Sequence, residues 1–285
     1  MHKLTLCMEV QDMDWSKRYA LLFITLVIGI TWGFNYYIFE NQNHLDMYTL
    51  SMIIPGVVAV LLNLIRYQNI QGVISPFNKP ISRQIIGFSV VYPVLFITVL
   101  AVLDVLCLIG TIDYQRLETL QWFPSLSVVV TGLLIVCAEE YGWRGFLLPN
   151  LAKCYGELSA TIVVGVVWAV WHVPAILFVA KLTQVGNVFT LVGVQICAMF
   201  VFSLPFAYCY FKSGSIVPPI LLHFIWNYYN PLILGSIYNN RHGIIDGDIL
   251  VINGEGVAGV VLGSLFLLWF IPRLMKRRLP PIYSI

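Results

Sequence analysis

The sequence predicts an all-α membrane protein: a bundle of about eight transmembrane helices that forms one integral membrane domain over residues 1–285. Hydrophobic residues make up 59% of the chain, charged residues make up only 11%, and the mean hydropathy is +0.83. A soluble protein has about 25% charged residues. Apolar runs of about 20 residues recur along the whole chain, and each is long enough to cross a bilayer as a helix. The net charge of +2 does not indicate a nucleic-acid partner.

The expected spans follow one another with little sequence left over for a soluble domain. Their approximate bounds are 19–39, 47–66, 84–110, 124–148, 157–181, 189–212, 215–236 and 255–272. Short connections join the fifth, sixth and seventh spans, so we expect these to be antiparallel neighbours. Pro93, Pro174 and Pro205 interrupt three of the spans, and neighbouring protein or water must satisfy the backbone groups that they free. No internal repeat is evident, so an inverted-repeat transporter gains no support.

Lys and Arg are distributed unequally between the two sides of such a bundle. With an even number of spans, twelve of these residues fall on the side of both termini and three on the other. The three are Arg116, Lys181 and Arg241. The positive-inside rule therefore predicts that both termini are cytoplasmic. On the opposite side, the connection 239–256 contains Asn-Gly and Asp-Gly turn signals, and a small hairpin is one expectation for it.

Two adjacent carboxylates stand inside the fourth span. Glu139 and Glu140 end an apolar run, and Arg144 follows one helical turn later. An ionisable side chain at membrane depth is unfavourable and usually faces a polar cavity or a partner. Three such residues within six positions are hard to explain by packing. We therefore expect this segment, within a motif-bearing core at 124–236, to be functional.

Matching polar groups lie at similar depth in two later spans. His172 is about 15 residues into the fifth span, roughly 22 Å at the helical rise. His223 and Asn227 are about 8 and 12 residues into the seventh span, roughly 12 and 18 Å. Glu139 is about ten residues, or roughly 15 Å, from the cytoplasmic end of its own span. These depths predict a single cluster in the cytoplasmic half of the membrane.

Residue spacing indicates which side chains can face one another. Glu140 and Arg144 are four apart and can pair, while Glu139 points about 100° away on the same helix and is free to face the two histidines. His223 and Asn227 are also four apart and share one helix face. A carboxylate with no cation beside it suits a general acid or base, and with a histidine it could activate water. Asn227 and a histidine could donate hydrogen bonds to a developing oxyanion.

Each of these residues also has a purely structural interpretation. A single histidine in a span often forms a structural hydrogen bond between helices. A Glu followed by an Arg four residues later often forms a structural ion pair. Trp168 and Trp171, beside His172, are expected to serve packing rather than chemistry. Asp104 in the third span is a further acid without an obvious partner, expected to be structural or pore-lining. The co-occurrence of the polar groups in three spans favours the functional interpretation.

The three segments together resemble the intramembrane proteases typified by the Ras-converting CAAX endopeptidase, which are grouped with bacteriocin-processing enzymes as the CPBP (Abi) family. That family has the motifs Glu-Glu-x-x-x-Arg, aromatic-x-x-x-His and His-x-x-x-Asn/Asp/Ser, in this order. Here they occupy residues 139–144, 168–172 and 223–227, and the range 139–227 that contains them is close to a third of the chain. Trp168 stands where Phe is commoner, a departure that is expected to alter pocket shape more than chemistry.

The resemblance implies a peptide hydrolase: an eight-helix bundle that opens to the cytosolic leaflet and cleaves a peptide bond near the cytosolic face. It implies that Glu139 and His172 activate the attacking water and that His223 with Asn227 stabilises the oxyanion. Glu140 and Arg144 would be supporting residues. The implied partners are membrane lipid and a peptide or lipidated peptide, such as a prenylated CAAX tail, although nothing in the chain selects that tail over another peptide precursor.

The resemblance leaves a metal open. If the reaction depends on a metal, Glu139, His172 and His223 would hold Zn²⁺ with an open fourth position. A metal-free glutamate mechanism, with no cofactor, is the favoured expectation, and the chain contains no HExxH motif.

Two other functions use the same buried polar residues. One is a proton- or cation-coupled transporter, with Glu139, Glu140 and Asp104 in its path. The other is a non-catalytic membrane scaffold, although a scaffold has no physical need for buried acids.

Overall fold

The computed structural model describes residues 2–183 and 185–275, and 81% of the structure is helical. In this part of the chain, seven helical segments are long and apolar enough to cross a membrane. They are Asp12–Glu40, Met47–Tyr67, Arg83–Leu106, Leu126–Tyr155, Glu157–Thr183, Val188–Ser213 and Ile249–Met275. The protein is therefore an integral, multi-pass membrane protein. Lys276, Arg277 and Arg278, which contribute to the predicted orientation, lie outside the described residues.

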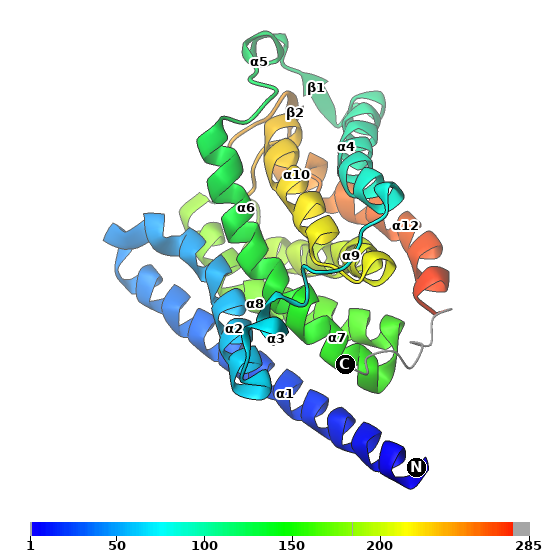
Figure 1. Ribbon diagram of the computed structural model, residues 1–285. Helices are drawn as coiled ribbons and strands as arrows, with labels where there is room; N and C mark the ends of the chain where they lie inside the picture. The colour runs from blue at the N-terminus through cyan, green and yellow to red at the C-terminus, as the bar shows by residue number, and fades with distance from the viewer. Residues whose placement is uncertain (1, 184, 276–285) are drawn as a thin grey trace.

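The elements follow the expected spans closely (Figure 1). The helices are α1 (His2–Glu40), the 3-10 helix η1 (Gln42–Ile53), α2 (Ile54–Tyr67), α3 (Ile70–Ile74), α4 (Arg83–Leu106), α5 (Tyr114–Thr119), α6 (Leu126–Glu140), the π-helix η2 (Tyr141–Leu147), α7 (Leu148–Tyr155), α8 (Glu157–Thr183), α9 (Val188–Ser213), α10 (Val217–Leu234), α11 (Ile249–Ile252) and α12 (Val257–Met275). The expected span 215–236 corresponds to α10, which has 18 residues and is not among the seven segments.

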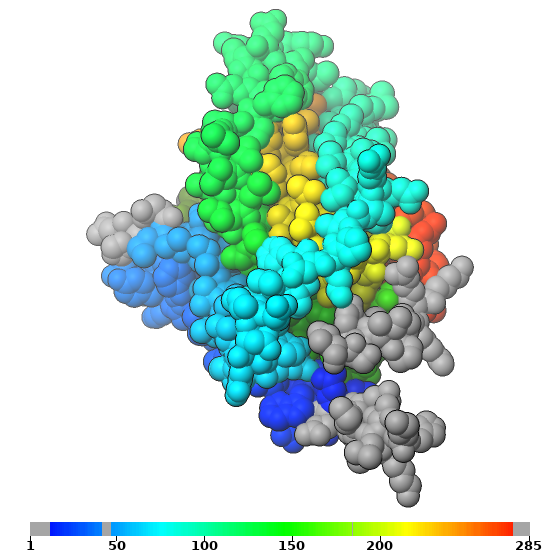
Figure 2. All heavy atoms as spheres, viewed as in Figure 1, coloured from blue at the N-terminus to red at the C-terminus, as the bar shows by residue number. Residues whose placement is uncertain are grey.

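Helix α10 lies between α6 and α4, where Figure 2 shows its side chains in the strip that separates them. On its other side it contacts α9, which packs along α8, as expected for neighbours joined by short connections. The core that these helices enclose is rich in aromatic side chains, among them Phe96, Trp168, Phe202 and Trp226. Helix α10 is thus positioned to present one face to the interior of the bundle.

Small residues allow α2 to approach the carboxylate-bearing segment closely. A Cβ at Gly56 would lie 2.5 Å from the backbone oxygen of Ala138, and a Cβ at Gly142 would lie 2.5 Å from Pro55. Both distances are too short for any side chain, so each glycine is required by the contact. This contact fixes α2 against the junction of α6 and η2, where Glu139 and Glu140 lie.

Two short strands close one end of the bundle, which we call the strand end (residues 107–125 and 235–256). Strand β1 (Gly110–Ile112) pairs antiparallel with β2 (Ile245–Gly247). The expected hairpin within 239–256 is therefore corrected: β2 pairs with β1, at and just beyond the end of the expected third span, and a single antiparallel bridge joins Ser236 to Arg241. Helix α4 ends earlier, at Leu106, and Leu108 has a φ of +59°, which turns the chain into β1.

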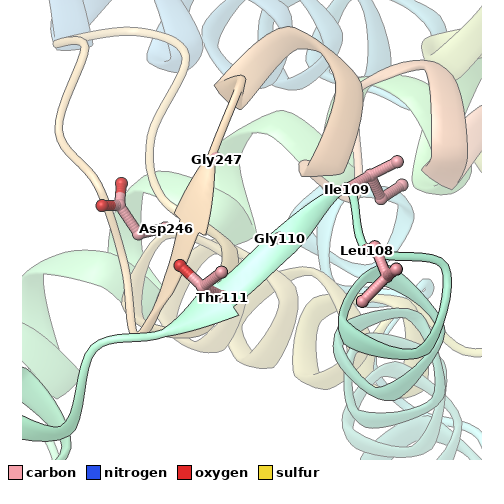
Figure 3. A pocket seen from close by; sticks show the side chains of 6 residues that line it. All are labelled: Leu108, Ile109, Gly110, Thr111, Asp246 and Gly247. Atoms are coloured by element: carbon pink, nitrogen blue, oxygen red, sulfur yellow. The ribbon is translucent and has the colours of Figure 1, made fainter.

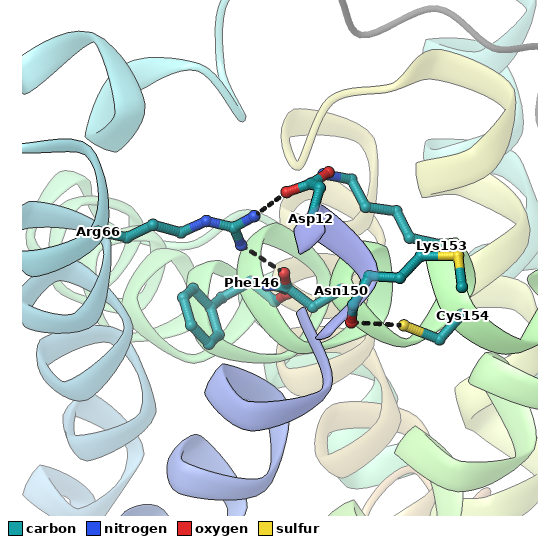
Figure 4. A network of polar contacts seen from close by, with 7 residues as sticks. Asp12, Arg66, Phe146, Asn150, Lys153 and Cys154 are labelled. Carbon is teal, nitrogen blue, oxygen red and sulfur yellow. Dashed lines mark hydrogen bonds and ion pairs between the residues drawn. The ribbon is translucent and has the colours of Figure 1, made fainter. Parts of the chain in front are cut away.

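A network of polar contacts marks the opposite end, which we call the basic end (Figure 4). Asp12 accepts hydrogen bonds from Arg66 (2.5 Å) and Lys153 (3.1 Å), and Arg66 also donates to Asn150 (2.8 Å). The structure thus gathers at one end residues that the sequence places on the side of the termini. How this end is oriented relative to the membrane remains a prediction.

Candidate active site

The four expected catalytic residues line one cavity of about 340 Å³. Glu139 comes from α6, His172 from α8, and His223 and Asn227 from α10. The remaining wall is built by η1, α9 and the connection 235–255 at the strand end. Three motifs that are distant in sequence therefore meet around a common space, while Glu140 and Arg144 lie behind its wall.

Glu139 is almost completely enclosed, with 1% of its surface exposed. The indole Nε1 of Trp168 donates a hydrogen bond of 2.8 Å to its Oε1. Its second oxygen, Oε2, has no hydrogen-bond partner among the described residues. One oxygen thus fixes the orientation of the carboxylate, and the other has no partner, as is also true of Oε2 of Glu140. A buried acceptor without a partner is uncommon and calls for an explanation. Of the two carboxylates, Glu139 is the one that lines the cavity.

Glu140 is bound to two basic side chains. Its Oε1 lies 3.0 Å from Nη1 of Arg144 and 2.8 Å from Nδ1 of His223, and the carboxylate is fully buried. The pair with Arg144 is the one that the spacing predicts. The bond to His223 is not, since the sequence analysis assigns both histidines to Glu139. Glu140 therefore orients a cavity residue through its ring nitrogen as well as neutralising the arginine.

Arg144 is held by rings as well as by charge. Its guanidinium carbon lies 4.6 Å from the centre of the Trp168 ring and 4.5 Å from that of Phe206. Aromatic faces attract a buried guanidinium because of the negative potential of their π electrons. Arg144 is completely buried, so this stacking compensates for part of its lost hydration.

The motif Glu-Glu-x-x-x-Arg spans a change of helix type that the sequence does not reveal. The α-helix ends at Glu140, and residues 141–147 form the π-helix η2 before α7 continues. π-Helical turns are rare and occur frequently at functional sites. Here the turn begins directly after the two carboxylates, and Arg144 within it still reaches Glu140.

The two histidines differ in the partner of Nδ1. In His172, Nδ1 lies 2.8 Å from the backbone oxygen of Trp168, which can only accept a hydrogen bond. The proton of neutral His172 is therefore on Nδ1, and Nε2 carries the lone pair. In His223, Nδ1 faces the carboxylate of Glu140, which stabilises a positive charge on the ring. Asn227 is exposed at the cavity wall, and its side chain makes no hydrogen bond within the described part.

Trp168 contributes more than the sequence analysis expects. Trp168 and Trp171 are expected to serve packing, and Trp171 does bond to Thr31 of α1 through its indole (2.8 Å). The indole of Trp168 instead bonds to Glu139 and stacks on Arg144. A phenylalanine at this position has no N–H to donate. With Trp where Phe is commoner, the chain gains a hydrogen-bond donor to the Glu139 carboxylate. The indole N–H at this motif position was the sequence signal that could have revealed this bond.

Glu255 is a cavity residue that the sequence analysis does not identify. From the sequence, Glu255 is only the first residue of the last expected span, 255–272. In the structure, Trp226 of α10 donates a 3.0 Å hydrogen bond to its Oε1, and the carboxylate lines the cavity at the strand end. The fold of the connection 235–256 brings it there, which no local pattern predicts.

Asp104 lies apart from this site. It is completely buried in α4, its two oxygens have no partner among the described residues, and it is not among the residues that line the cavity. The pore-lining interpretation is therefore not supported. Its Cβ lies beside Gly110 of β1. A separate hollow of about 350 Å³ at these strands, lined by Thr111 and Asp246 among others, shares no residue with the cavity (Figure 3).

Glu139, His172 and His223 do not form a metal site in the structure. Among the side chains that the structure describes, no three from His, Cys, Asp or Glu come together as a group that could hold a metal ion. Nδ1 of His172 bonds to Trp168 and Nδ1 of His223 bonds to Glu140. Such contacts are usual for the second ring nitrogen of a metal-bound histidine, and they leave Nε2 as the nitrogen that would coordinate Zn²⁺. The three side chains would have to move closer together to do so.

Comparisons with known proteins agree with the motifs. Residues 121–229 match the family model of the type II CAAX prenyl endopeptidases, Rce1-like. This stretch contains all three motifs. A protein named CAAX prenyl protease 2, from Methanococcus maripaludis, is 25% identical over 178 residues, which are 59% of this chain and 65% of that protein. The predicted resemblance to this family is thereby confirmed. The match spans somewhat less than two thirds of the relative's length.

We expect Glu140→Gln to destabilise the protein strongly. The substitution leaves Arg144 buried without a carboxylate, and removal of one partner of a buried pair typically costs about 3–5 kcal/mol. Asp12→Asn is the matched control, because Asp12 is half exposed and surface pairs contribute about 0–1 kcal/mol. Thermal unfolding of both variants in detergent measures the difference. Equal unfolding temperatures for the two variants would contradict the structural role of Glu140.

Proposed function

We propose that the protein is an intramembrane endopeptidase that hydrolyses a peptide bond inside the cavity described above. The observation that supports this most strongly is that four polar side chains from three separate motifs surround one cavity. The relative's name refers to prenylated CAAX proteins, so a lipidated C-terminal peptide is the first substrate class to test. No observation favours a transporter or a scaffold.

The proposed reaction begins with water held between Glu139 and His172. Oε2 of Glu139 and Nε2 of His172 are the free acceptors, and either can remove a proton from water as it attacks the peptide carbonyl. Trp168 keeps Glu139 in position through Oε1. The carbon–nitrogen bond of the peptide then breaks, and the proton that Glu139 or His172 took from water passes to the leaving amine.

In the proposed reaction, residues of α10 stabilise the oxyanion. Glu140 beside Nδ1 of His223 favours the imidazolium, which carries an N–H on Nε2 as well. That N–H and the amide of Asn227 are the proposed donors to the oxyanion. Glu140 and Arg144 act as positioning residues in this scheme, since they do not line the cavity.

The proposal includes the membrane arrangement. We propose that α10 is an eighth span, so that the chain is a single integral domain with motif-bearing core 124–236 and both termini cytoplasmic. Following the family resemblance, we place the cleaved bond near the cytosolic face.

We expect Glu139→Gln to lower cleavage of a fluorogenic farnesylated CAAX peptide at least about 100-fold, because it removes the general base. The glutamine oxygen still accepts the bond from Trp168, so folding is expected to be retained. Glu118→Gln, an exposed charge change on α5, is the control and should cleave normally. The assay uses detergent-purified protein, with and without a chelator, and with the same peptide lacking the lipid.

The effect of the chelator and the effect of Glu139→Gln test the metal-free scheme and the peptidase activity separately. Chelator-resistant cleavage that is lost only in Glu139→Gln supports the metal-free scheme, whereas loss on chelation would favour a metal held by Glu139, His172 and His223. A folded wild-type protein that cleaves neither peptide, or a Glu139→Gln variant as fast as wild type, would contradict the proposed function.

Orientation can be read from cysteine accessibility. Cys107 is exposed at the strand end, and Asn78→Cys would place a thiol in the connection before α4 at the basic end. In single-cysteine variants expressed in intact bacterial spheroplasts, we expect a membrane-impermeant maleimide to label Cys107 and not residue 78. The reverse pattern would place both the termini and the basic end outside and would contradict the proposed orientation.

A further inference from the structure

The cavity contains a second carboxylate, at the strand end, that the proposed reaction does not use. Glu255 is 8% exposed, and among the described residues its side chain has one hydrogen bond, which Oε1 accepts from Trp226. No Lys, Arg or His side chain forms an ion pair with it in the described part of the chain. His223 lines the same cavity and interacts with Glu255 electrostatically, but its ring is bound to Glu140. An enclosed acid that faces a cavity without an ion-pair partner is a strong indication of a ligand site.

The loop that carries Glu255 is firmly held. The backbone oxygen of Glu255 accepts a 2.8 Å bond from Gln195, and its backbone N–H donates to Asn253 (2.9 Å). Next to it, the N–H of Gly254 donates to Asn230 of α10 (3.0 Å). A Cβ at Gly254 would lie 2.5 Å from the Asn230 oxygen, so the loop can pack here only with glycine. The position of the carboxylate is therefore set by the fold.

A structural role alone does not explain a carboxylate at this position. The indole of Trp226 requires only a neutral acceptor, which glutamine would supply. A buried charge without an ion-pair partner is strongly unfavourable, and packing alone does not require one. The same cavity is lined by Tyr48 and Tyr238, whose rings can surround a cation. Acid and aromatic rings together favour a positively charged ligand group.

We propose that Glu255 is a specificity-determining residue that binds a Lys or Arg side chain of the peptide substrate. This inference rests on the proposed function. Trp226 and Asn230, which bond to Glu255 and its loop, are three and seven residues from His223 on α10, or about 4.5 and 10 Å along the helix. An extended peptide advances about 3.3 Å per residue, so the cation belongs one to three residues from the cleaved bond. The same carboxylate repels a free C-terminal carboxylate at this position.

The test is a series of peptides with blocked ends. The parent is neutral, and lysine or norleucine is placed in turn at each of the three positions on either side of the cleaved bond. At one position, we expect lysine to raise kcat/KM at least about tenfold over norleucine. In Glu255→Gln, which keeps an acceptor for Trp226, the ratio should fall to about 1. Glu118→Gln removes the same charge outside the cavity and should keep the ratio.

A merely structural Glu255 would change the cleavage of all peptides alike and leave the lysine-to-norleucine ratio unchanged. No preference for lysine at any position, or a preference that survives in Glu255→Gln, would overturn the inference.

Binding separates this inference from the proposed function. In the Glu139→Gln background, we expect the lysine peptide to bind at least about tenfold more tightly than the norleucine peptide, and the difference to vanish when Glu255→Gln is added. Selective binding without cleavage by wild type would support Glu255 and overturn the peptidase. Cleavage without selective binding would support the peptidase and overturn the role of Glu255.

Discussion

The site depends on one buried carboxylate, Glu140, which is bound at the same time to Arg144 and His223. These contacts join η2 to α6 and α6 to α10, so they set the rotation of α10 relative to the first motif. Once His223 is fixed, Asn227 one turn later faces the same cavity. The aromatic contacts of Arg144 extend the arrangement to α8, because Trp168 stacks on the guanidinium and bonds to Glu139. A single charge cluster thus aligns all three motif-bearing helices.

This arrangement gives two adjacent glutamates different surroundings. Oε1 of Glu140 is bound to two basic side chains and the residue lies behind the cavity wall, while Glu139, one residue earlier, lines the cavity and has no ion pair among the described residues. Oε2 of each carboxylate has no hydrogen-bond partner in the described part of the chain. The histidines divide in the same way. His172 bonds to a backbone oxygen and retains a basic nitrogen, and His223 bonds to a carboxylate that favours its charged form. The proposed base and the proposed oxyanion donor therefore differ in what Nδ1 contacts rather than in residue type.

The sequence predicts those features that depend on spacing within one helix. The pair Glu140–Arg144 and the shared face of His223 and Asn227 follow from a separation of four residues, and the spans follow from long apolar runs. Contacts between helices are different, because they depend on how each helix is rotated. The bond from His223 to Glu140 and that from Trp168 to Glu139 are of this kind. Glu255 enters the cavity through the path of an irregular connection, and strands of three residues are too short to be recognised from their sequence.

The central claim, that Glu139 is available and Glu140 is not, can be tested without any substrate. A hydrophobic carbodiimide enters the membrane and modifies carboxyl groups that no cation holds. After treatment of the purified protein, mass spectrometry of the peptide containing both residues can assign the adduct, because fragment ions separate position 139 from 140. We expect an adduct on Glu139 and none on Glu140. Modification of Glu140 to the same extent, or of Glu140 alone, would contradict it.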